Sequence, residues 1–354
     1  MMRRFSTPVF VGNVQIGGAA PVSVQSMNNT DTRDVKATLE QIRSLAACGC
    51  EITRVAVPDR EAALALSDIT KASPIPVVAD IHFDYRLAIL AMENGAAKIR
   101  INPGNLGGAD RIAAVAKVAA ERKIPIRVGV NSGSISKEIL TRFGGVNRES
   151  MAESAILAVE ALEQIGFHDT VISIKSSDPL LTIESYKLLA EKTRYPLHVG
   201  VTESGTISEG AIRSAVGIGT LLYLGIGDTI RVSLTSDPTD EVRAAYSILK
   251  SLSLRKRGMR LISCPTCGRT QVPLIELATR VEKEIQDLPY DLKIAIMGCA
   301  VNGPGEAREA DIGIAGGVNE FLLFKKGVPV RKISPENALE ELMKEIHALG
   351  DTKE

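Results

Sequence analysis

Hydrophobic residues follow two alternating patterns as far as Leu234. Short runs rich in β-branched residues predict strands, and an Ala- and Leu-rich stretch with helical spacing follows each run. The predicted strands are Val22–Met27, Ile52–Val57, Pro76–Ile81, Lys98–Asn102, Ile126–Val130, Val171–Lys175, Leu197–Thr202 and Thr229–Leu234. The predicted helices are Asp34–Ala47, Glu61–Lys71, Asp84–Glu93, Arg111–Arg122, Glu149–Ile165, Leu180–Thr193, Ala211–Leu222 and Pro238–Leu252. Eight strand–helix units in series predict an α/β protein with a (β/α)8 TIM barrel, because a doubly wound open sheet usually needs fewer units.

The pattern changes at the basic connector Leu254–Gly258. The chain beyond it predicts a strand that ends at a Cys-x-x-Cys motif, and then further strands and helices. These are the helix Pro273–Asp287, the strands Leu292–Met297, Ile312–Ala315 and Phe321–Phe324, and the helix Pro335–Leu349. We therefore expect the barrel over residues 1–253 and a small α+β domain over residues 258–354.

The composition indicates a cytoplasmic protein that binds neither nucleic acid nor membrane. Lys and Arg together number 42, as do Asp and Glu, so no global charge favours such partners. Five cysteines are too few for a disulfide framework and are typical of a reducing compartment. The N-terminal segment lacks the apolar core of a signal peptide, and the chain contains no stretch of eighteen apolar residues.

Basic residues recur at alternate positions of the predicted strands, here called one parity, so they share one face of each strand. Alternate positions of the strands carry Arg54, Arg100, Arg127, Lys175 and Arg231, and their sequence neighbours are apolar. Because side chains alternate between the two faces of a strand, we expect these five cations to converge inside the barrel. Asp80 is the only acid that shares their parity. Unpaired buried cations are costly and arginine binds phosphate in a bidentate manner, so the pattern predicts a diphosphate or bisphosphate ligand.

Two further residues near predicted strand ends are candidates for proton chemistry. Glu203 follows the seventh strand and is a candidate general acid, although it could instead cap the following helix. His82 could form a hydrogen-bonded pair with Asp80, or be an ordinary core histidine. Cys48 and Cys50 are expected to be packing residues.

Three cysteines of the second domain form a candidate metal site. Cys264 and Cys267 belong to one motif, and Cys299 precedes an Asn-Gly-Pro-Gly-Glu run that ends at Glu306. A fourth ligand is missing, and it could be a non-cysteine side chain such as Glu306, the substrate, or a barrel cysteine. Structural zinc normally has four Cys or His ligands, so an iron–sulfur cluster with one weaker ligand fits better. Buried, inert cysteines are the remaining alternative.

The motifs of both domains closely resemble those of 4-hydroxy-3-methylbut-2-enyl diphosphate synthases of the non-mevalonate isoprenoid pathway. They are Gly17–Met27, Ile101–Asn105, Gly129–Asn131, Thr202–Gly205, Ser263–Arg269 and Met297–Glu306. The resemblance covers essentially the whole chain and is to the bacterial two-domain form. It implies a two-electron reductive opening of 2-C-methyl-D-erythritol 2,4-cyclodiphosphate, with loss of water.

The resemblance also implies the cofactor, the partners and the roles of particular residues. It implies a [4Fe-4S] cluster held by Cys264, Cys267, Cys299 and Glu306, electrons from flavodoxin or ferredoxin, and catalysis by Glu203. It further implies a homodimer in which the cluster domain of one subunit closes over the barrel mouth of the other. The implied substrate-binding residues are Arg54, His82, Arg100, Asn102, Arg127, Asn131, Lys175, Arg231, Ser233 and Asn302.

Two other functions remain compatible with the residues alone. One is a non-redox TIM-barrel transferase, acting on a pterin or a sugar phosphate, with a structural zinc domain attached. The other is an iron–sulfur electron carrier without substrate chemistry, which the convergent arginines argue against. Iron and sulfide analysis of the purified protein separates these functions from the reductase.

Overall fold

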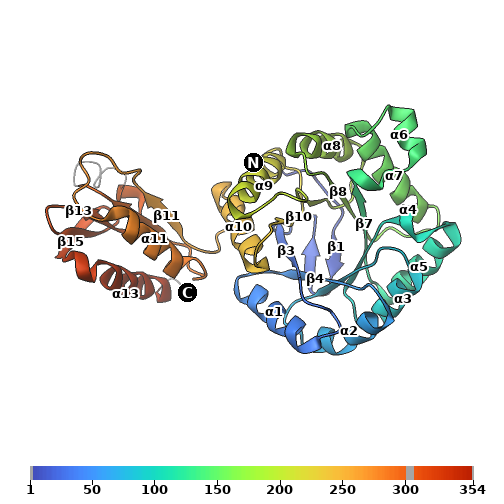
Figure 1. Ribbon diagram of the computed structural model, residues 1–354, viewed down its shortest axis with the longest axis horizontal. Helices are drawn as coiled ribbons and strands as arrows, with labels where there is room; N and C mark the ends of the chain where they lie inside the picture. The colour runs from blue at the N-terminus through green and yellow to red at the C-terminus, as the bar shows by residue number, and fades with distance from the viewer. Residues whose placement is uncertain (1–2, 300–306, 353–354) are drawn as a thin grey trace. The chain divides into compact units, whose positions relative to one another are not determined.

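The computed structural model of the chain describes residues 3–299 and 307–352 (Figure 1). The chain divides into two compact units, Met1–Arg255 and Lys256–Glu354. Each unit has a hydrophobic core of its own. None of the described helices is both long enough and apolar enough to span a membrane.

The first unit is a barrel of eight parallel strands. In chain order they are β3 (Ser23–Met27), β4 (Ile52–Ala56), β5 (Val77–Asp80), β6 (Lys98–Ile101), β7 (Ile126–Asn131), β8 (Thr170–Lys175), β9 (His198–Val199) and β10 (Thr229–Ile230). Hydrogen bonding runs in the order β8-β7-β6-β5-β4-β3-β10-β9. A parallel bridge between Ile172 and Leu197 joins the two ends of this series. The predicted α/β barrel is therefore confirmed.

Helices surround the barrel strands (Figure 1). They are α1 (Val35–Ala47), α2 (Arg60–Ala72), α3 (Tyr85–Glu93), α4 (Pro103–Leu106), α5 (Ala109–Arg122), α6 (Lys137–Phe143), α7 (Arg148–Glu163), α8 (Pro179–Lys192), α9 (Ile207–Tyr223) and α10 (Pro238–Ser251). The short helices α4 and α6 were not predicted. Local capping sets the start of α8, where the Asp178 carboxylate accepts a hydrogen bond from the Leu180 amide at 2.8 Å. The same arrangement starts α10, where Asp237 accepts from the Thr239 amide at 2.9 Å.

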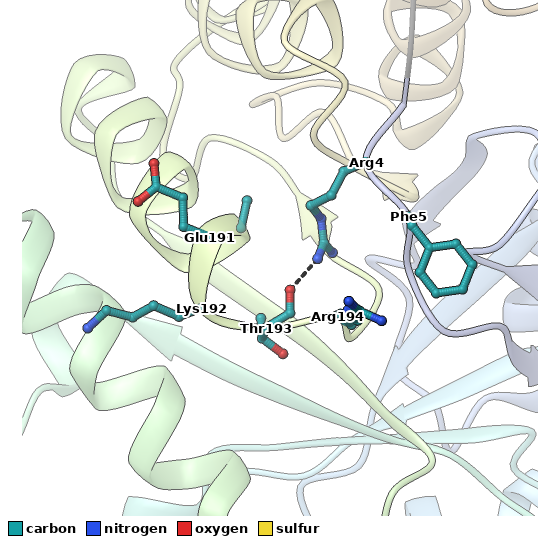
Figure 2. A pocket seen from close by; sticks show the side chains of 7 residues that line it. Arg4, Phe5, Glu191, Lys192, Thr193 and Arg194 are labelled. Carbon is teal, nitrogen blue, oxygen red and sulfur yellow. Dashed lines mark hydrogen bonds between the residues drawn. The ribbon is translucent and has the colours of Figure 1, made fainter.

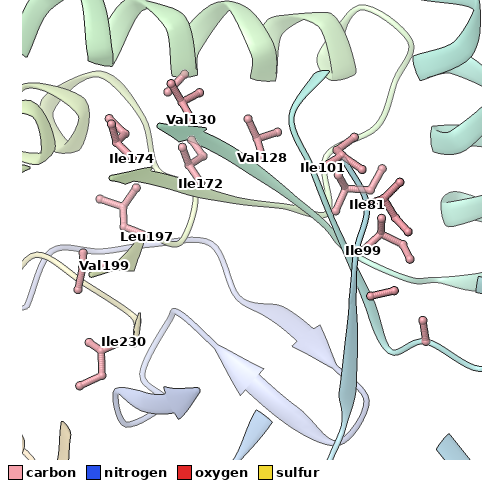
Figure 3. Packing of buried hydrophobic residues seen from close by; sticks show 14 of the residues in the cluster. Ile81, Ile99, Ile101, Val128, Val130, Ile172, Ile174, Leu197, Val199 and Ile230 are labelled. Carbon is pink, nitrogen blue, oxygen red and sulfur yellow. The ribbon is translucent and has the colours of Figure 1, made fainter. Parts of the chain in front are cut away.

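The outward faces of the strands form the hydrophobic core of this unit. Figure 3 shows Ile99 and Ile101 of β6, Val128 and Val130 of β7, and Ile172 and Ile174 of β8 in this cluster. All of them are at most 1% exposed. Burying each such side chain stabilises the fold by roughly 1.5–3 kcal/mol. The alternate positions of the same strands are therefore turned toward the barrel interior.

A β-hairpin that the hydrophobic pattern did not reveal precedes the barrel. It consists of β1 (Val9–Val11) and β2 (Val14–Ile16), which pair antiparallel. Its two-residue connection uses Gly12 at φ +57°, a conformation suited to a hairpin turn. Val11 and Ile16 pack against Ile52 and Val78 at the start of the barrel strands. The hairpin thus supplies apolar contacts to the N-terminal end of the barrel interior.

The N-terminal segment is tied to the barrel by Arg4. Figure 2 shows its guanidinium directed at the carbonyl oxygen of Thr193, and it also donates to the Tyr195 carbonyl. The backbone amide of Arg4 donates to the Gly225 carbonyl at 2.9 Å. Arg4 therefore satisfies carbonyl groups in the loop that follows α8 and fixes the path of the chain toward the hairpin.

The second unit is a five-stranded mixed sheet with two main helices. The strands β11 (Arg260–Ser263), β12 (Lys293–Met297), β13 (Ile312–Gly316), β14 (Phe321–Lys325) and β15 (Val328–Ile333) lie in that order. The first three are parallel, and the last three are joined antiparallel. The helices are α11 (Leu274–Ile285) and α13 (Ala338–Asp351). Strand β15 was not predicted, because Pro329 and the adjacent Arg331 and Lys332 obscure the alternation.

Candidate active site

The five cations of the predicted pocket converge in the barrel interior. Arg54, Arg100, Arg127 and Lys175 are each at most 8% exposed, and the Arg231 side chain is 16% exposed. Burial, together with the positive charges of the four arginines, holds the pKa of Lys175 well below its usual range. All four guanidinium groups therefore lie close enough to act on one ammonium group. Such a cluster is electrostatically suited to a polyanion.

Asp80 is the carboxylate on the lumen face of the barrel strands. Its Oδ1 lies 3.3 Å from Arg100 Nη1, and its Oδ2 lies 3.8 Å from Arg54 Nε. Burial alone would raise the pKa of Asp80, but the charges of Arg54 and Arg100 outweigh burial, so the pKa lies below its usual range. Arg100 Nη1 also lies 3.3 Å from His82 Nε2. His82 and Asp80 thus share Arg100 as a partner and make no hydrogen bond with each other among the described residues, so the direct pair considered from the sequence is not found.

Arg231 has an acidic partner that the strand pattern did not reveal. Glu241, in the first turn of α10, accepts hydrogen bonds from Arg231 Nη2 at 2.9 Å and Nε at 3.2 Å. It is 4% exposed and also accepts from the Ser26 hydroxyl at 2.9 Å. Glu241 is therefore a second acid in contact with the cluster, and strand alternation could not reveal it because it lies on a helix.

Two glycines on the lumen face make room for cationic side chains. A Cβ atom at Gly129 of β7 would lie 2.7 Å from Arg100 Nε. A Cβ atom at Gly200, just after β9, would lie 3.1 Å from Lys175 Nζ and 2.5 Å from the Arg231 carbonyl oxygen. Real Cβ atoms essentially never approach within 3.0 Å, so Arg100 depends on Gly129 for its position, and Gly200 lets the backbone at Arg231 approach closely beside Lys175.

The remaining barrel candidates lie at or near the C-terminal ends of the strands. Asn102 is buried, Ser233 is half-buried, and His82 and Asn131 are exposed. Glu203 is exposed in the loop between β9 and α9. The N-cap of α9 is Thr206, so Glu203 does not cap that helix. Its φ of +52° is uncommon for a non-glycine residue, and such backbone strain is concentrated at functional sites.

The three candidate ligand cysteines line one pocket of the second unit. Cys264 directly follows β11 and Cys299 follows β12, and these strands are parallel neighbours, so both residues lie at the same sheet edge. The pocket has a volume of about 130 Å³ and is also lined by Cys267. The Cys267 amide donates to Thr270 Oγ1 at 3.2 Å, which closes the loop between the motif cysteines and α11.

Thiol donors on one pocket wall suit an iron–sulfur group. Among the described residues, no three Cys, His, Asp or Glu side chains are arranged to hold a metal ion. Glu306 and Asn302, the predicted fourth ligand and a predicted substrate contact, lie outside the described residues. The donor type therefore fits the predicted cofactor, and its complete ligand set extends beyond what the structure describes.

The barrel cysteines lie in or against the core of the first unit. Cys50 is 3% exposed, and its thiol lies 3.2 Å from the Ile52 carbonyl oxygen. Burial raises the pKa of Cys50 to about 12. A buried thiol whose pKa is raised is a weak candidate for a metal ligand. Cys48 is the C-cap of α1 and packs against the same core.

Two family models match the chain, one over each unit. The GcpE TIM-barrel domain matches residues 6–246, and the GcpE protein C-terminal domain matches residues 260–348. The chain belongs to the GcpE family. This finding confirms the resemblance inferred from the motifs of both domains.

Relatives in the GcpE family are similar over nearly the whole chain. The 4-hydroxy-3-methylbut-2-en-1-yl diphosphate synthase (flavodoxin) of Ruminiclostridium cellulolyticum is 60% identical over 344 residues, which cover 97% of this chain and 98% of the relative. The protein of the same name from Caldanaerobacter subterraneus subsp. tengcongensis is 57% identical over 348 residues, 98% of each chain.

Two solved structures are similar in fold to about 70% of this chain. Dihydropteroate synthase from Stenotrophomonas maltophilia matches with a TM-score of 0.51 and 15% identity, covering 70% of this chain and 97% of that one. The Burkholderia cenocepacia enzyme matches with a TM-score of 0.50 and 13% identity, covering 71% and 99%. At such low identity the likeness shows a shared fold alone.

The barrel contains a further cation that sequence reasoning missed. Lys98 lies two residues before Arg100 on β6 and shares its parity, so the signal was present in the sequence. Its side chain is fully buried, and Nζ has no hydrogen-bond partner among the described residues. Glu241 had no comparable signal in the sequence, because an acidic residue in the first turn of a helix is normally explained by helix capping or by the helix dipole.

Proposed function

We propose that this GcpE-family chain converts 2-C-methyl-D-erythritol 2,4-cyclodiphosphate to 4-hydroxy-3-methylbut-2-enyl diphosphate. Two electrons and one proton enter, the ring C–O bond breaks, and one oxygen leaves as water. The structural observation that carries this proposal is the excess of cations in the barrel mouth, where Asp80 and Glu241 are the acids in contact with them. A cyclic diphosphate supplies the missing negative charge, and relatives at 60% and 57% identity carry the name of this enzyme.

The barrel residues bind and orient the diphosphate in this proposal. Arg100 and Arg54 are held by Asp80, and Arg231 is held by Glu241, so their guanidinium groups are preorganised before the anion arrives. The full set assigned to the substrate comprises Arg54, Arg100, Arg127, Lys175, Arg231 and Ser233, with His82, Asn102, Asn131 and Asn302.

The cysteine pocket is assigned to a [4Fe-4S] cluster. Cys264, Cys267 and Cys299 would hold it by thiolate ligation, with Glu306 as an oxygen ligand that can be replaced. When bound, the cluster supplies single-electron transfer from a reduced flavodoxin or ferredoxin. The names of the relatives support flavodoxin as the donor.

Glu203 is assigned the role of proton donor to the departing oxygen. Its carboxyl group lies in the loop after β9, at the strand end where TIM-barrel enzymes have their active sites. Its backbone φ of +52° is a conformation that is concentrated at functional sites. We further propose a cytoplasmic homodimer in which the cluster domain of one subunit closes over the barrel mouth of the other, because such closure would exclude water from the reaction.

Anaerobic purification followed by turnover tests the proposed function. The protein should contain about four iron and four sulfide per chain and should consume the cyclic diphosphate when a reduced flavodoxin is supplied. Glu203→Gln should keep the iron content and lose most turnover. The control Glu209→Gln changes an exposed glutamate of α9 and should keep both properties. Colourless protein with one zinc would exclude the proposal, and full turnover by Glu203→Gln would exclude the acid role.

A further inference from the structure

A layer of buried polar side chains lies on the lumen face, toward the N-terminal ends of the strands. Lys98, His198 and Thr229 are fully buried, and Gln25 is 1% exposed. The nitrogen atoms of Lys98 and His198 and both amide atoms of Gln25 have no hydrogen-bond partners among the described residues. Arg127 Nε and Nη1 share this property. Buried polar groups are normally paired, so this layer calls for an explanation.

Lys98 has surroundings that are hard to reconcile with a permanent charge. The charges that act on it are those of Arg127 and Arg54, which repel an ammonium group. Asp80 is already engaged by Arg100 and Arg54. A buried ammonium without a carboxylate costs several kcal/mol, and a neutral amine avoids that cost.

The titratable and charged groups on every neighbouring strand support the same conclusion. The lumen faces of β4 to β10 contribute Arg54, Asp80, Arg100, Arg127, Lys175, His198 and Arg231, and β3 contributes Ser23, Gln25 and Met27. Val11 and Ile16 of the hairpin are apolar. Asp228, at the base of β10, is paired with Arg3 at 3.0 Å. Burial and nearby cations lower the pKa of His198 as well. A histidine carries no negative charge in either protonation state, so His198 cannot offset an ammonium group at Lys98.

We propose that Lys98 is the proton-uptake site of the diphosphate pocket, neutral in the substrate-free enzyme and protonated when the polyanion binds beside Arg100 and Arg127. This inference rests on the proposed function, because it needs an anion in the barrel mouth. Negative charge near Lys98 favours its charged form, and the new ammonium in turn attracts the anion. Lys98 thereby adds a positive charge to the pocket only when a ligand offsets it.

The pH window follows from the direction of the shift. Burial and the charges of Arg127 and Arg54 hold the pKa of Lys98 well below its usual range in the empty pocket. Ligand binding raises this pKa. Protons are therefore taken up where the pH lies between the two values, and uptake vanishes below the lower value and above the upper one.

Isothermal titration calorimetry in buffers of different ionisation enthalpy measures this uptake directly. The oxidised holoenzyme is titrated anaerobically with the cyclic diphosphate, without a reductant, so that the ligand binds but is not turned over. Each phosphorus of this ligand carries one strongly acidic oxygen, so the ligand itself does not titrate near neutrality. The slope of observed enthalpy against buffer enthalpy, measured at several pH values, should correspond to as much as one proton taken up per site inside this pH window.

Variants assign the proton to a residue. Lys98→Met should abolish the slope, and Lys98→Gln repeats the test if the Met variant does not fold. His198→Gln should retain the uptake. Lys117→Met, at an exposed position of α5, is the matched control and should also retain it. A slope near zero in the wild type, or uptake that persists without Lys98, overturns the proposal.

Inorganic sulfate separates this inference from the proposed function. Sulfate is fully ionised at neutral pH and needs only the cationic mouth to bind. If the cyclic diphosphate fails to bind while sulfate binds with Lys98-dependent uptake, the proposed substrate is wrong and the role of Lys98 stands. If both ligands bind without uptake, the role of Lys98 is wrong and the substrate assignment stands.

Discussion

The Asp80→Asn variant tests whether the barrel mouth is a cluster of cations held in place by a carboxylate. In the wild type, the Asp80 oxygens lie 3.3 Å from Arg100 Nη1 and 3.8 Å from Arg54 Nε. At an effective dielectric constant of about 20, each contact contributes roughly 4–5 kcal/mol of Coulomb energy before desolvation is counted. Removing one partner of a buried ion pair costs about 3–5 kcal/mol in measured cases. Because Asn keeps one acceptor for Arg100, we expect a loss of about 3 kcal/mol.

Thermal unfolding of the substrate-free protein is the appropriate assay. For a unit of this size, about 3 kcal/mol corresponds to a fall in apparent Tm of roughly 6–12 °C. Sulfate should raise the Tm of Asp80→Asn more than that of the wild type, because an anion replaces the lost carboxylate. The control Asp68→Asn changes an exposed residue of α2 and should leave Tm nearly unchanged.

The pH dependence of this difference has a definite sign. Arg54 and Arg100 outweigh burial and lower the pKa of Asp80 in the folded state. The stabilisation is therefore fully present above the unfolded-state pKa of about 3.9 and is lost as the pH falls through the lower folded-state value. The difference in Tm between wild type and Asp80→Asn should thus be the same at pH 7 and pH 6. If Asp80→Asn has the same Tm as the Asp68→Asn control, and sulfate raises its Tm no more than that of the wild type, the reasoning is refuted.

Two further predictions concern the glycine at the pocket and the assignment of the cysteines. Gly129→Ala places a Cβ 2.7 Å from Arg100 Nε and should displace that guanidinium, raising KM roughly 10- to 100-fold with little change in Tm. The control is Gly133→Ala, where a Cβ meets no atom within 4 Å. An unchanged KM for Gly129→Ala would contradict the positioning role. Cys50→Ala should retain the full iron content of the anaerobically purified protein, whereas Cys264→Ala should lose most of it. Loss of iron in both variants would support Cys50 as a cluster ligand.

The sequence pattern predicted most of the elements because their signals are local. A β-strand buried on one face must alternate, and the core side of β7 shows this with Ile126, Val128 and Val130. The same alternation assigned Arg54, Arg100 and Arg127 to the barrel interior. Strands β9 and β10 are shorter than predicted, ending at Val199 and Ile230, because the chain turns into loops at the barrel mouth. The hairpin β1–β2 and the edge strand β15 were missed, because three-residue strands and a proline-containing edge give weak periodicity.

By itself, the sequence determined which chemical groups the protein carries and on which face of a strand or helix each one lies. Only the tertiary structure decided which groups meet. Arg231 pairs with Glu241 from a helix, Arg100 connects Asp80 with His82, and Lys98 Nζ has no hydrogen-bond partner within the described part of the chain. The physical reason is that alternation and helical spacing are properties of neighbouring residues. Ion pairing and desolvation depend instead on distances between residues far apart in the chain, which exist only once the barrel has closed.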